Sequence, residues 1–373
     1  MSSEYAAALA AVLRHETLPQ GALAPDPAAF ARACEDDDLT GLVYDVVRKQ
    51  AGSDWVRTVR SALAAEARAH VAEELLRRRE LMTVLETLAA ANVQPIVIKG
   101  MALAYSFYAE PAARRCRDTD LLVRRDEVTV VRGVLARLGY GPAHQCDGEL
   151  LFYQVALKKT DGFGFVHTLD VHWKISTQSV FAGLLTFDEI AAASMRLPAL
   201  GAHARGAGPL HALLLACVHP IMHHRRAHSL VWVYDVHLLA SRLSAPQFER
   251  FADLALEKQV AAVCAHQLML AARLMGTRLP DGALRRLDTA GTSEASAAYL
   301  RPNRQWLNEL VWNLQGLRSW RDRLRLLREI AFPGPRYILQ TYRIASSVGA
   351  VLLPVLYLHR LTTGGWKVIT GRK

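Results

Sequence analysis

Two aspartates separated by one residue are the strongest candidates for catalytic chemistry in this sequence. Asp118 and Asp120 stand at the start of a short apolar run, residues 119–123, which predicts a β-strand. Side chains alternate along a strand, so both carboxylates point to the same side. Two negative charges this close need a positive charge between them, and a divalent cation commonly supplies it. We therefore predict that Asp118 and Asp120 bind Mg²⁺ or Mn²⁺.

A second predicted strand, residues 165–175, carries Asp170, His172 and Lys174 on one side, with apolar residues between them. Asp170 would add a third carboxylate to the metal site. Two cations about 4 Å apart, held by three carboxylates, activate an attacking oxygen and stabilise a leaving pyrophosphate. His172 and Lys174 are then candidates for the acceptor side. Taken alone, each motif also fits an ordinary strand start or a solvated strand residue, so the interpretation depends on their surroundings.

The segment before the aspartate pair has the composition of a phosphate-binding turn. Lys99 and Gly100 follow a β-branched run and precede a predicted helix. A glycine at that position lets the backbone approach a phosphate closely, and the helix N-terminus favours negative charge. Arg114 and Arg117 lie just before the aspartates and, like Lys99, can pair with triphosphate oxygens. We predict that all four residues bind the nucleotide.

The order of these motifs resembles the DNA-polymerase-β-like nucleotidyltransferase superfamily. More narrowly, it resembles uncharacterised bacterial nucleotidyltransferase family proteins, which carry Lys-Gly near a short helix, followed by Y-x-x-P and R-x-x-x-D-x-D-L-L-V. The resemblance covers about residues 95–175 and extends through a helical part to Asp235. The matching positions in this sequence are Lys99, Gly100, Tyr108, Pro111, Arg114, Asp118 and Asp120.

The resemblance implies a function and a set of roles. Asp118 and Asp120 would be metal ligands, Asp170 the third carboxylate, and Gly100 with its flanking amides the phosphate cradle. The protein would move a nucleoside monophosphate from an NTP, such as ATP, to an acceptor hydroxyl or phosphate on a small molecule, a peptide or RNA. The superfamily has Gly-Ser or Gly-Gly where this chain has Gly100-Met101, so a serine hydroxyl for the phosphate is missing. The alternatives are a catalytically degenerate nucleotide- or nucleic-acid-binding protein and a membrane-peripheral scaffold.

Five histidines within residues 211–228 invite a metal interpretation. His219 and His223 are four residues apart and would share a helix face. A proline stands where an H-E-x-x-H zinc motif needs glutamate, so structural or substrate-lining roles are favoured. In the resembling proteins a helix of this kind precedes W-x-x-D-x-x-x-L, which begins here at Trp232. Its aspartate, Asp235, is predicted to contact a helix or to lie on the acceptor side.

Local patterns place these motifs in a small α/β module. Residues 54–91 are rich in Ala, Leu, Glu and Arg, with apolar positions at helical spacing, which predicts a long amphipathic helix. The patterns then predict strand 96–98, helix 101–110, strand 119–123, helix 126–138, and strands 150–157 and 165–175. Strand signals end near residue 185, and helices are predicted at 209–218, 230–242, 246–256, 260–275 and 305–329.

This order predicts an α+β fold: a small mixed β-sheet nucleotidyltransferase core with flanking helices, preceded by an N-terminal helical region and followed by an α-helical domain. The boundaries that we predict are residues 1–91 for the N-terminal helical region, 92–185 for the core, 186–335 for the helical domain and 336–373 for an apolar and basic tail.

The composition is that of a globular protein. Of 373 residues, 51% are hydrophobic and 21% charged, which excludes extensive disorder and a multi-span membrane protein. The five cysteines are odd in number, widely spaced and without a C-x-x-C motif, and residues 1–13 lack the basic start of a secretory signal. We therefore expect a cytoplasmic protein.

The positive charge is confined to the last part of the chain. Residues 301–373 hold 13 Lys and Arg against 3 Asp and Glu, which accounts for the whole net charge of +10. Arginines there recur at helical spacing and form either an RNA-binding stripe or a solvated face: Arg318, Arg321, Arg325 and Arg328. Residues 344–358 are apolar but shorter than the roughly 20 residues that span a bilayer. The tail is therefore either an anchor for RNA or for the anionic inner face of a membrane, or a buried helix with a solvated basic end.

Overall fold

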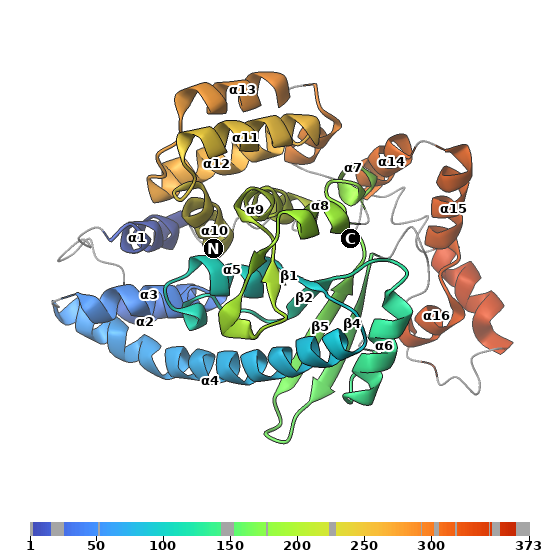
Figure 1. The fold of residues 1–373 in the computed structure, drawn as a ribbon, viewed down its shortest axis with the longest axis horizontal. Coiled ribbons are helices and arrows are strands. Elements are labelled where there is room, and N and C mark those ends of the chain that lie inside the picture. Colours follow the sequence, from blue (N-terminus) through green and yellow to red (C-terminus); the bar gives the residue numbers. More distant parts are fainter. Residues whose placement is uncertain are drawn as a thin grey trace.

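The computed structural model describes residues 3–15, 26–50, 53–142, 153–176, 178–223, 229–291, 293–301, 306–317, 319–342, 344 and 351–362. Within these residues, helices surround one mixed β-sheet (Figure 1). The predicted α+β fold class is confirmed.

The first four helices lead into the sheet. They are α1 (Ser3–Leu13), α2 (Pro27–Asp36), α3 (Thr40–Lys49) and α4 (Asp54–Ala90). The long helix predicted at residues 54–91 is α4, and it runs along the full width of the sheet beneath it (Figure 1). Ser53 caps its N-terminus, because the Ser53 hydroxyl accepts a hydrogen bond from the Val56 amide.

The sheet combines parallel and antiparallel pairs in the order β3-β4-β5-β2-β1-β7-β6. Its central strands β1 and β2 are antiparallel, while β2 and β5 are parallel, with Asp120 directly opposite Asp170. The strand bounds are β1 (Ile96–Ile98), β2 (Thr119–Leu122), β3 (Gly141–Pro142), β4 (Gln154–Thr160), β5 (Val166–His172), β6 (Met195–Arg196) and β7 (Arg205–Gly206).

The two faces of the sheet belong to different cores. Val97, Leu121 and Val171 pack with residues of α4 and of α6 (Val128–Arg137) in one cluster. Their strand neighbours Ile98 and Leu122 belong to a second cluster, which they share with the C-terminal helices. Because side chains alternate along a strand, residue 120 lies on the second face together with residues 170 and 172. The polar residues thus face the helical part of the protein.

Two short helices connect the central strands, α5 (Lys99–Phe107) and the 3₁₀ helix η2 (Pro111–Ala113). Of the helices that follow β5 in the chain, η3 packs with α4 on the first face, and the others cover the second face or extend from it. The helices after β5 are α7 (Ser179–Ala182), α8 (Phe187–Ala192), η3 (Pro198–Leu200), α9 (Pro209–His223), α10 (Leu230–Ala240), α11 (Ala245–Glu257), α12 (Ala261–Met275), α13 (Asp281–Gly291), η4 (Ala295–Leu300), α14 (Trp306–Gly316), α15 (Trp320–Ala331) and α16 (Pro335–Thr341). Residues 351–362 are also helical.

The N-terminal helices pack against the C-terminal helices as well as against the sheet. The hydrophobic cluster that contains Leu9 of α1 also contains Leu268 of α12. The guanidinium of Arg14 donates a hydrogen bond to the carbonyl of Leu274 at 2.5 Å, and the Leu230 amide donates one to the carboxylate of Asp37. The boundaries after residues 91, 185 and 335 stay predictions.

Several elements differ from the sequence predictions. The helix predicted at residues 101–110 begins at Lys99 and ends at Phe107. The single helix predicted at residues 305–329 is two helices, α14 and α15, and Ser319 caps the second. The absence of strands after residue 185 is wrong, since β6 and β7 pair onto the edge of β1. Strands of two residues are too short to carry a period in the sequence, so only pairing reveals them.

Candidate active site

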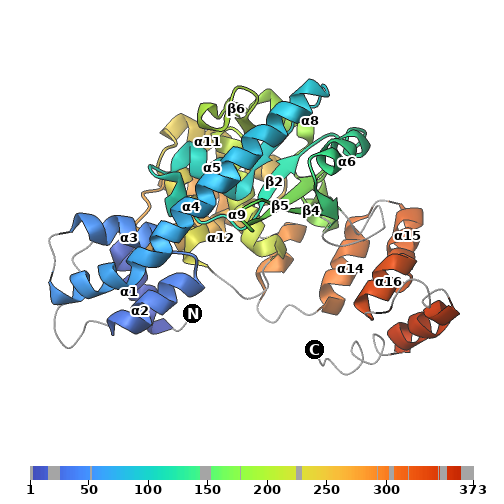
Figure 2. The ribbon, with the colours of Figure 1, turned by 90° about the horizontal axis from the view of Figure 1, so that it is seen from below.

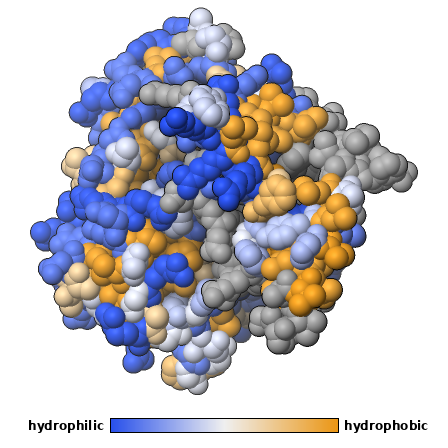
Figure 3. Space-filling model, turned by 90° about the vertical axis from the view of Figure 1, so that its right-hand side faces the viewer, coloured by the Kyte–Doolittle hydropathy of each residue, from blue (hydrophilic) through white to orange (hydrophobic). Residues whose placement is uncertain are grey.

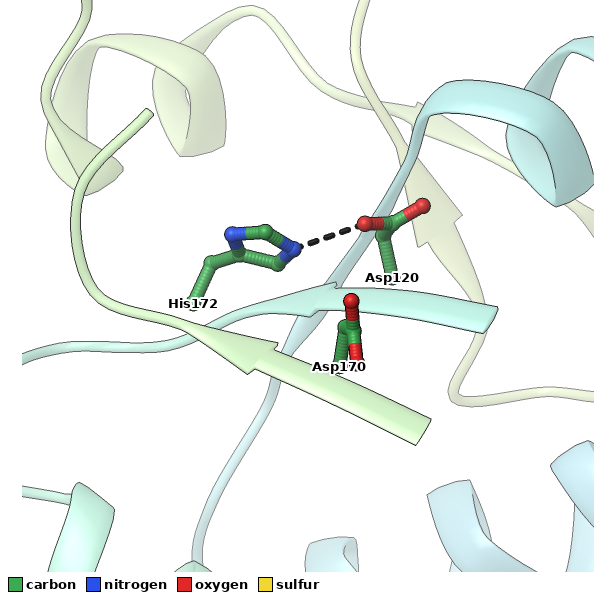
Figure 4. A group of neighbouring side chains, drawn as sticks. All are labelled: Asp120, Asp170 and His172. Atoms are coloured by element: carbon green, nitrogen blue, oxygen red, sulfur yellow. Dashed lines mark hydrogen bonds and ion pairs between the residues drawn. The ribbon is translucent and has the colours of Figure 1, made fainter. Parts of the chain in front are cut away.

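Three side chains that can bind a metal ion meet on the helical face of the sheet. Asp120 comes from β2, and Asp170 and His172 come from β5; one ligand atom from each lies within 4.8 Å of the others (Figure 4). The parallel register of the two strands produces this meeting, because it sets Asp120 opposite Asp170. Among the residues that the structure describes, this is the group of His, Cys, Asp and Glu side chains whose geometry suits a metal ion.

Asp120 is buried and holds two partners. The Lys99 ammonium donates a hydrogen bond to Asp120 Oδ1 at 2.6 Å, and His172 Nε2 lies 2.7 Å from the same oxygen. A carboxylate only accepts hydrogen bonds, so His172 Nε2 carries the proton. Burial opposes ionisation, but these two partners outweigh it and hold the pKa of Asp120 well below its usual value. Asp120 is therefore ionised at neutral pH.

The pKa values of His172 and Lys99 are shifted in opposite directions. Burial and the neighbouring Lys99 charge lower the pKa of His172 to about 4, so its imidazole is neutral. Burial also acts to lower the pKa of Lys99, but the Asp120 carboxylate beside it raises that pKa above the usual value. The ammonium of Lys99 is thus the positive charge that balances Asp120.

Asp170 has a free buried oxygen. Its Oδ2 accepts a hydrogen bond from Gln154 Nε2 at 2.6 Å, while its Oδ1 is buried without a hydrogen-bond partner. Burial, followed by the charges of Asp120 and Asp118, raises the pKa of Asp170 to about 6. Two carboxylates, one with an unpaired buried oxygen, form a donor set that fits a divalent cation, and the imidazole of His172 would join it in the other tautomer, with its proton on Nδ1.

The raised pKa of Asp170 has a consequence for stability. A carboxyl group whose pKa is higher in the folded state than in the unfolded state costs stability as the pH rises from about 4 to 6. Without divalent cations, we expect Asp170→Asn to be more stable than the parent by about 2 kcal/mol at pH 8, and the difference to vanish near pH 4. Urea unfolding across this pH range measures it.

The control for that prediction is Asp288→Asn, because Asp288 lies exposed on α13 away from the site. Its stability should follow that of the parent at every pH. An Asp170→Asn protein less stable than the parent at pH 8 would contradict the charge repulsion that we infer.

The other residues that we predicted for the site lie outside this group of three side chains. Asp118 lies just before β2, exposed and outside the group of three, although the loss of hydration there and the charge of Asp120 raise its pKa. Lys174 lies two residues beyond the end of β5 and is half-buried. Arg117 is exposed and pairs with Asp38 at 2.9 Å. Gly100 is the second residue of α5.

The turn at Lys99 and Gly100 is tightly built. Lys99 adopts a left-handed backbone conformation with φ of 56°, which is uncommon for a residue with a side chain. A Cβ atom on Gly100 would come within 3.1 Å of Cys116 Sγ. The start of α5 therefore stands directly beside the segment that leads into Asp118 and Asp120.

Arg114 and Asp235 form a buried ion pair that joins the sheet module to the helical part. Arg114 Nε and Nη2 donate to the two carboxylate oxygens of Asp235 at 3.0 and 2.9 Å, and the Tyr108 hydroxyl donates to Asp235 Oδ1 at 2.6 Å. Burial acts against the charged guanidinium, yet the Asp235 carboxylate raises the pKa of Arg114. The structure thus brings together a residue predicted to bind the nucleotide and one predicted for the acceptor side.

A cavity of about 440 Å³ opens between the start of α5, the helices α9 and α10, and the turn after α2. One part of its wall consists of the backbone of Gly100 and charged side chains: Asp38, Lys99, Arg117, Asp118 and Asp120. Another part is mainly apolar and aromatic: Leu103, Phe107, Leu215, His219, Val231 and Trp232. The cavity offers a polar region for phosphates and an apolar region for a ring system.

One histidine of the motif, His219, lines the cavity. His219 meets Trp232 edge to face, with ring centroids 5.7 Å apart, and both line the cavity. The side chain of His223, and residues His224 and His228, lie outside the described part of the chain. The zinc interpretation of this segment stays a prediction.

Sequence reasoning missed two contributors to the site. Asp38, which pairs with Arg117, belongs to a run of three aspartates at residues 36–38 that line the cavity. These three consecutive aspartates are apparent in the sequence and could have been predicted to belong to the site. Gln154, which binds Asp170, had no such signal, because its role depends on the pairing of β4 with β5.

Comparison with known proteins identifies the family. No curated protein matches the sequence. The family model described as an uncharacterised nucleotidyltransferase matches residues 24–276, more than half of the chain, and the protein therefore belongs to this family of nucleotidyltransferases.

Proposed function

We propose that the protein transfers a nucleoside monophosphate from an NTP, ATP among them, to an acceptor hydroxyl or phosphate of a small molecule, a peptide or an RNA. The observation that carries the proposal is the meeting of Asp120 and Asp170 on neighbouring parallel strands, beside the start of α5. Paired carboxylates attract the divalent cation that accompanies an NTP, and a helix N-terminus attracts its phosphates. Both features lie within residues 24–276, which match the model of the uncharacterised nucleotidyltransferase family.

Asp120 and Asp170, with His172 beside them, would hold Mg²⁺ or Mn²⁺, and Asp118 adds a carboxylate to the cavity that Asp120 lines. When bound, such a cation neutralises phosphate charge and supports departure of pyrophosphate. The Gly100 amide and the exposed guanidinium of Arg117 would bind phosphate oxygens.

Asp170 is our candidate for the base. Its pKa of about 6 lies near neutral pH, and its Oδ1 has no hydrogen-bond partner, so it can accept the proton of an acceptor hydroxyl. The acceptor oxygen then forms a bond to the α-phosphorus, the bond from that phosphorus to the bridging oxygen breaks, and pyrophosphate leaves. His172 and Lys174 are proposed for the acceptor side.

Calorimetry with each NTP tests this proposal. We expect the parent to bind at least one NTP in the presence of Mg²⁺ or Mn²⁺ and to lose that binding without a divalent cation. Asp170→Asn should weaken the binding at least about tenfold, equivalent to about 1.4 kcal/mol, while Asp288→Asn should bind like the parent. The ranking of the four nucleotides would then direct the search for the acceptor.

If no NTP binds under any of these conditions, the transferase proposal is wrong and the Gly100-Met101 turn marks a degenerate site. Equal binding by Asp170→Asn and the parent would remove Asp170 from the metal site.

We also propose a cytoplasmic location, supported by four cysteines of the described chain with free thiols: Cys34, Cys116, Cys217 and Cys264.

A further inference from the structure

Exposed hydrophobic side chains concentrate in one part of the protein. We call residues 306–317, 319–342 and 351–362 the C-terminal arm; it contains α14, α15, α16 and the last described helix. More than half of the large hydrophobic side chains that are exposed in the described chain belong to this arm, which is a small fraction of its residues. Figure 2 shows the arm extending away from the body that contains the sheet.

Two helices of the arm turn an apolar stripe outward. In α15, Trp320, Leu324 and Leu327 follow the spacing i, i+4, i+7 and are 66%, 56% and 40% exposed. A helix of a globular protein normally buries such a stripe against the core. In α15 the buried position is Leu326 instead.

The helix at residues 351–362 repeats the pattern. Val351, Val355 and Leu358 follow the same spacing and are 84%, 62% and 64% exposed. The alternative of a buried terminal helix is therefore wrong for these residues. The side of the molecule that carries the arm faces the viewer in Figure 3, where hydrophobic residues gather in patches beside hydrophilic ones.

The charge of the arm indicates which class of partner fits it. Arg321, Arg323 and Arg328 are exposed on α15 beside the apolar stripe, and residues 301–373 hold all of the net positive charge. A face with Trp and Leu next to Arg is typical of a helix that lies in the interface of an anionic membrane. RNA binding would use the arginines and Trp320, but it would leave exposed aliphatic side chains such as Leu324 and Val355 without a role.

The arm would lie on the membrane surface and not cross it. No helix of the described chain is long and apolar enough to span a bilayer. The arm is attached to the body through α14, where Asn313 accepts hydrogen bonds from the amide and the hydroxyl of Ser179 with its side-chain and backbone oxygens, at 2.9 and 2.8 Å. The attachment leaves α15 and residues 351–362 free of the cavity that contains Asp120.

We propose that the exposed apolar stripes of α15 and residues 351–362, with the arginines beside them, dock the protein on an anionic lipid surface. The proposal is independent of the reaction at Asp120, because it depends only on the exposure and charge of the arm.

Co-sedimentation of the full chain with vesicles tests the proposal. The vesicles are phosphatidylcholine alone, or phosphatidylcholine with a one-third share of phosphatidylglycerol. We expect at least tenfold stronger binding to the anionic vesicles, and we expect salt to weaken it because ions screen the arginine charges.

Two pairs of substitutions distinguish binding through the arm from non-specific hydrophobic binding. Leu324→Glu with Leu358→Glu should reduce binding to anionic vesicles at least tenfold, and both positions are exposed, so the fold should keep its melting temperature. Leu75→Glu with Val130→Glu is the matched control, since these side chains are 53% and 49% exposed on α4 and α6, outside the arm. The control pair should bind like the parent.

Three results would overturn the proposal. The first is no binding to anionic vesicles, and the second is equal loss of binding in the control pair and the arm pair. The third is self-association without lipid that Leu324→Glu with Leu358→Glu abolishes, because a second copy of the chain would then be the partner of this face.

Discussion

Replacing Lys99 by methionine is expected to make the stability of this protein depend on divalent cations. The Lys99 ammonium is the cation beside the buried Asp120 carboxylate, with Asp118 and Asp170 nearby. Removing one partner of a buried ion pair leaves an uncompensated charge and costs about 3–5 kcal/mol. We expect a loss of that size in urea unfolding of Lys99→Met at pH 8 without divalent cations.

Millimolar Mg²⁺ should restore much of this loss, because a cation bound to Asp120 and Asp170 would supply the missing positive charge. Lowering the pH toward 5 should also restore stability. Without Lys99, burial raises the pKa values of the carboxyl groups against only the hydrogen bonds from His172 and Gln154, so their protonation should then favour the folded state.

The matched control is Lys159→Met. Lys159 forms a partly buried ion pair with Glu80 at 2.7 Å, away from the site. Its loss of stability should be smaller and should not respond to Mg²⁺. If Mg²⁺ stabilises both variants equally, Lys99 does not occupy the charge position that we assign to it.

The second large effect is expected at the buried pair of Arg114 and Asp235. Asp235→Asn should lower the free energy of unfolding by about 3–5 kcal/mol, because the Arg114 guanidinium would stay buried without a carboxylate. Asparagine still offers an oxygen to the Tyr108 hydroxyl and to Arg114 Nε, but its amide nitrogen replaces the oxygen that accepts from Arg114 Nη2, so the variant removes the charge together with one hydrogen bond.

Adding Arg114→Met to Asp235→Asn should recover most of the lost stability, since no unpaired charge then remains. Urea unfolding of the parent, both single variants and the double variant gives the coupling energy of the pair. A coupling near zero would mean that the two side chains do not stabilise one another, and Arg114 would then be available for a nucleotide.

If the coupling is large, Arg114 acts as a positioning residue. Its guanidinium lies beside the turn at Gly100, since a Cβ on Gly100 would lie 3.9 Å from it, and its pairing with Asp235 would then fix the turn relative to the helical part. NTP binding by the double variant then tests this role. If the double variant recovers the free energy of unfolding but binds the NTP more weakly than the parent, the pair orients the phosphate-binding turn.

Local patterns were sufficient to predict the central elements of the fold. The apolar period of residues 54–90, the β-branched run at 96–98 and the alternation around Asp170 each depend on neighbours within a few residues. These elements appear in the structure within a few residues of their predicted bounds. The break between α14 and α15 and the two-residue strands β6 and β7 were missed, because pairing and capping in the folded chain decide them.

The amino-acid sequence by itself determined the family, the mixed sheet and the aspartates that serve as candidates for catalysis, because these depend on residue types at short, regular spacing. Only the tertiary structure decided which charges meet. Lys99 pairs with Asp120 across 21 residues of chain, and Arg114 pairs with Asp235 across 121 residues. Spacing along a chain carries no information about such contacts, since strand register and helix packing set them. The same reason explains the arm, where the sequence predicted arginines at helical spacing and an apolar run, and only the packing decided that apolar side chains face outward.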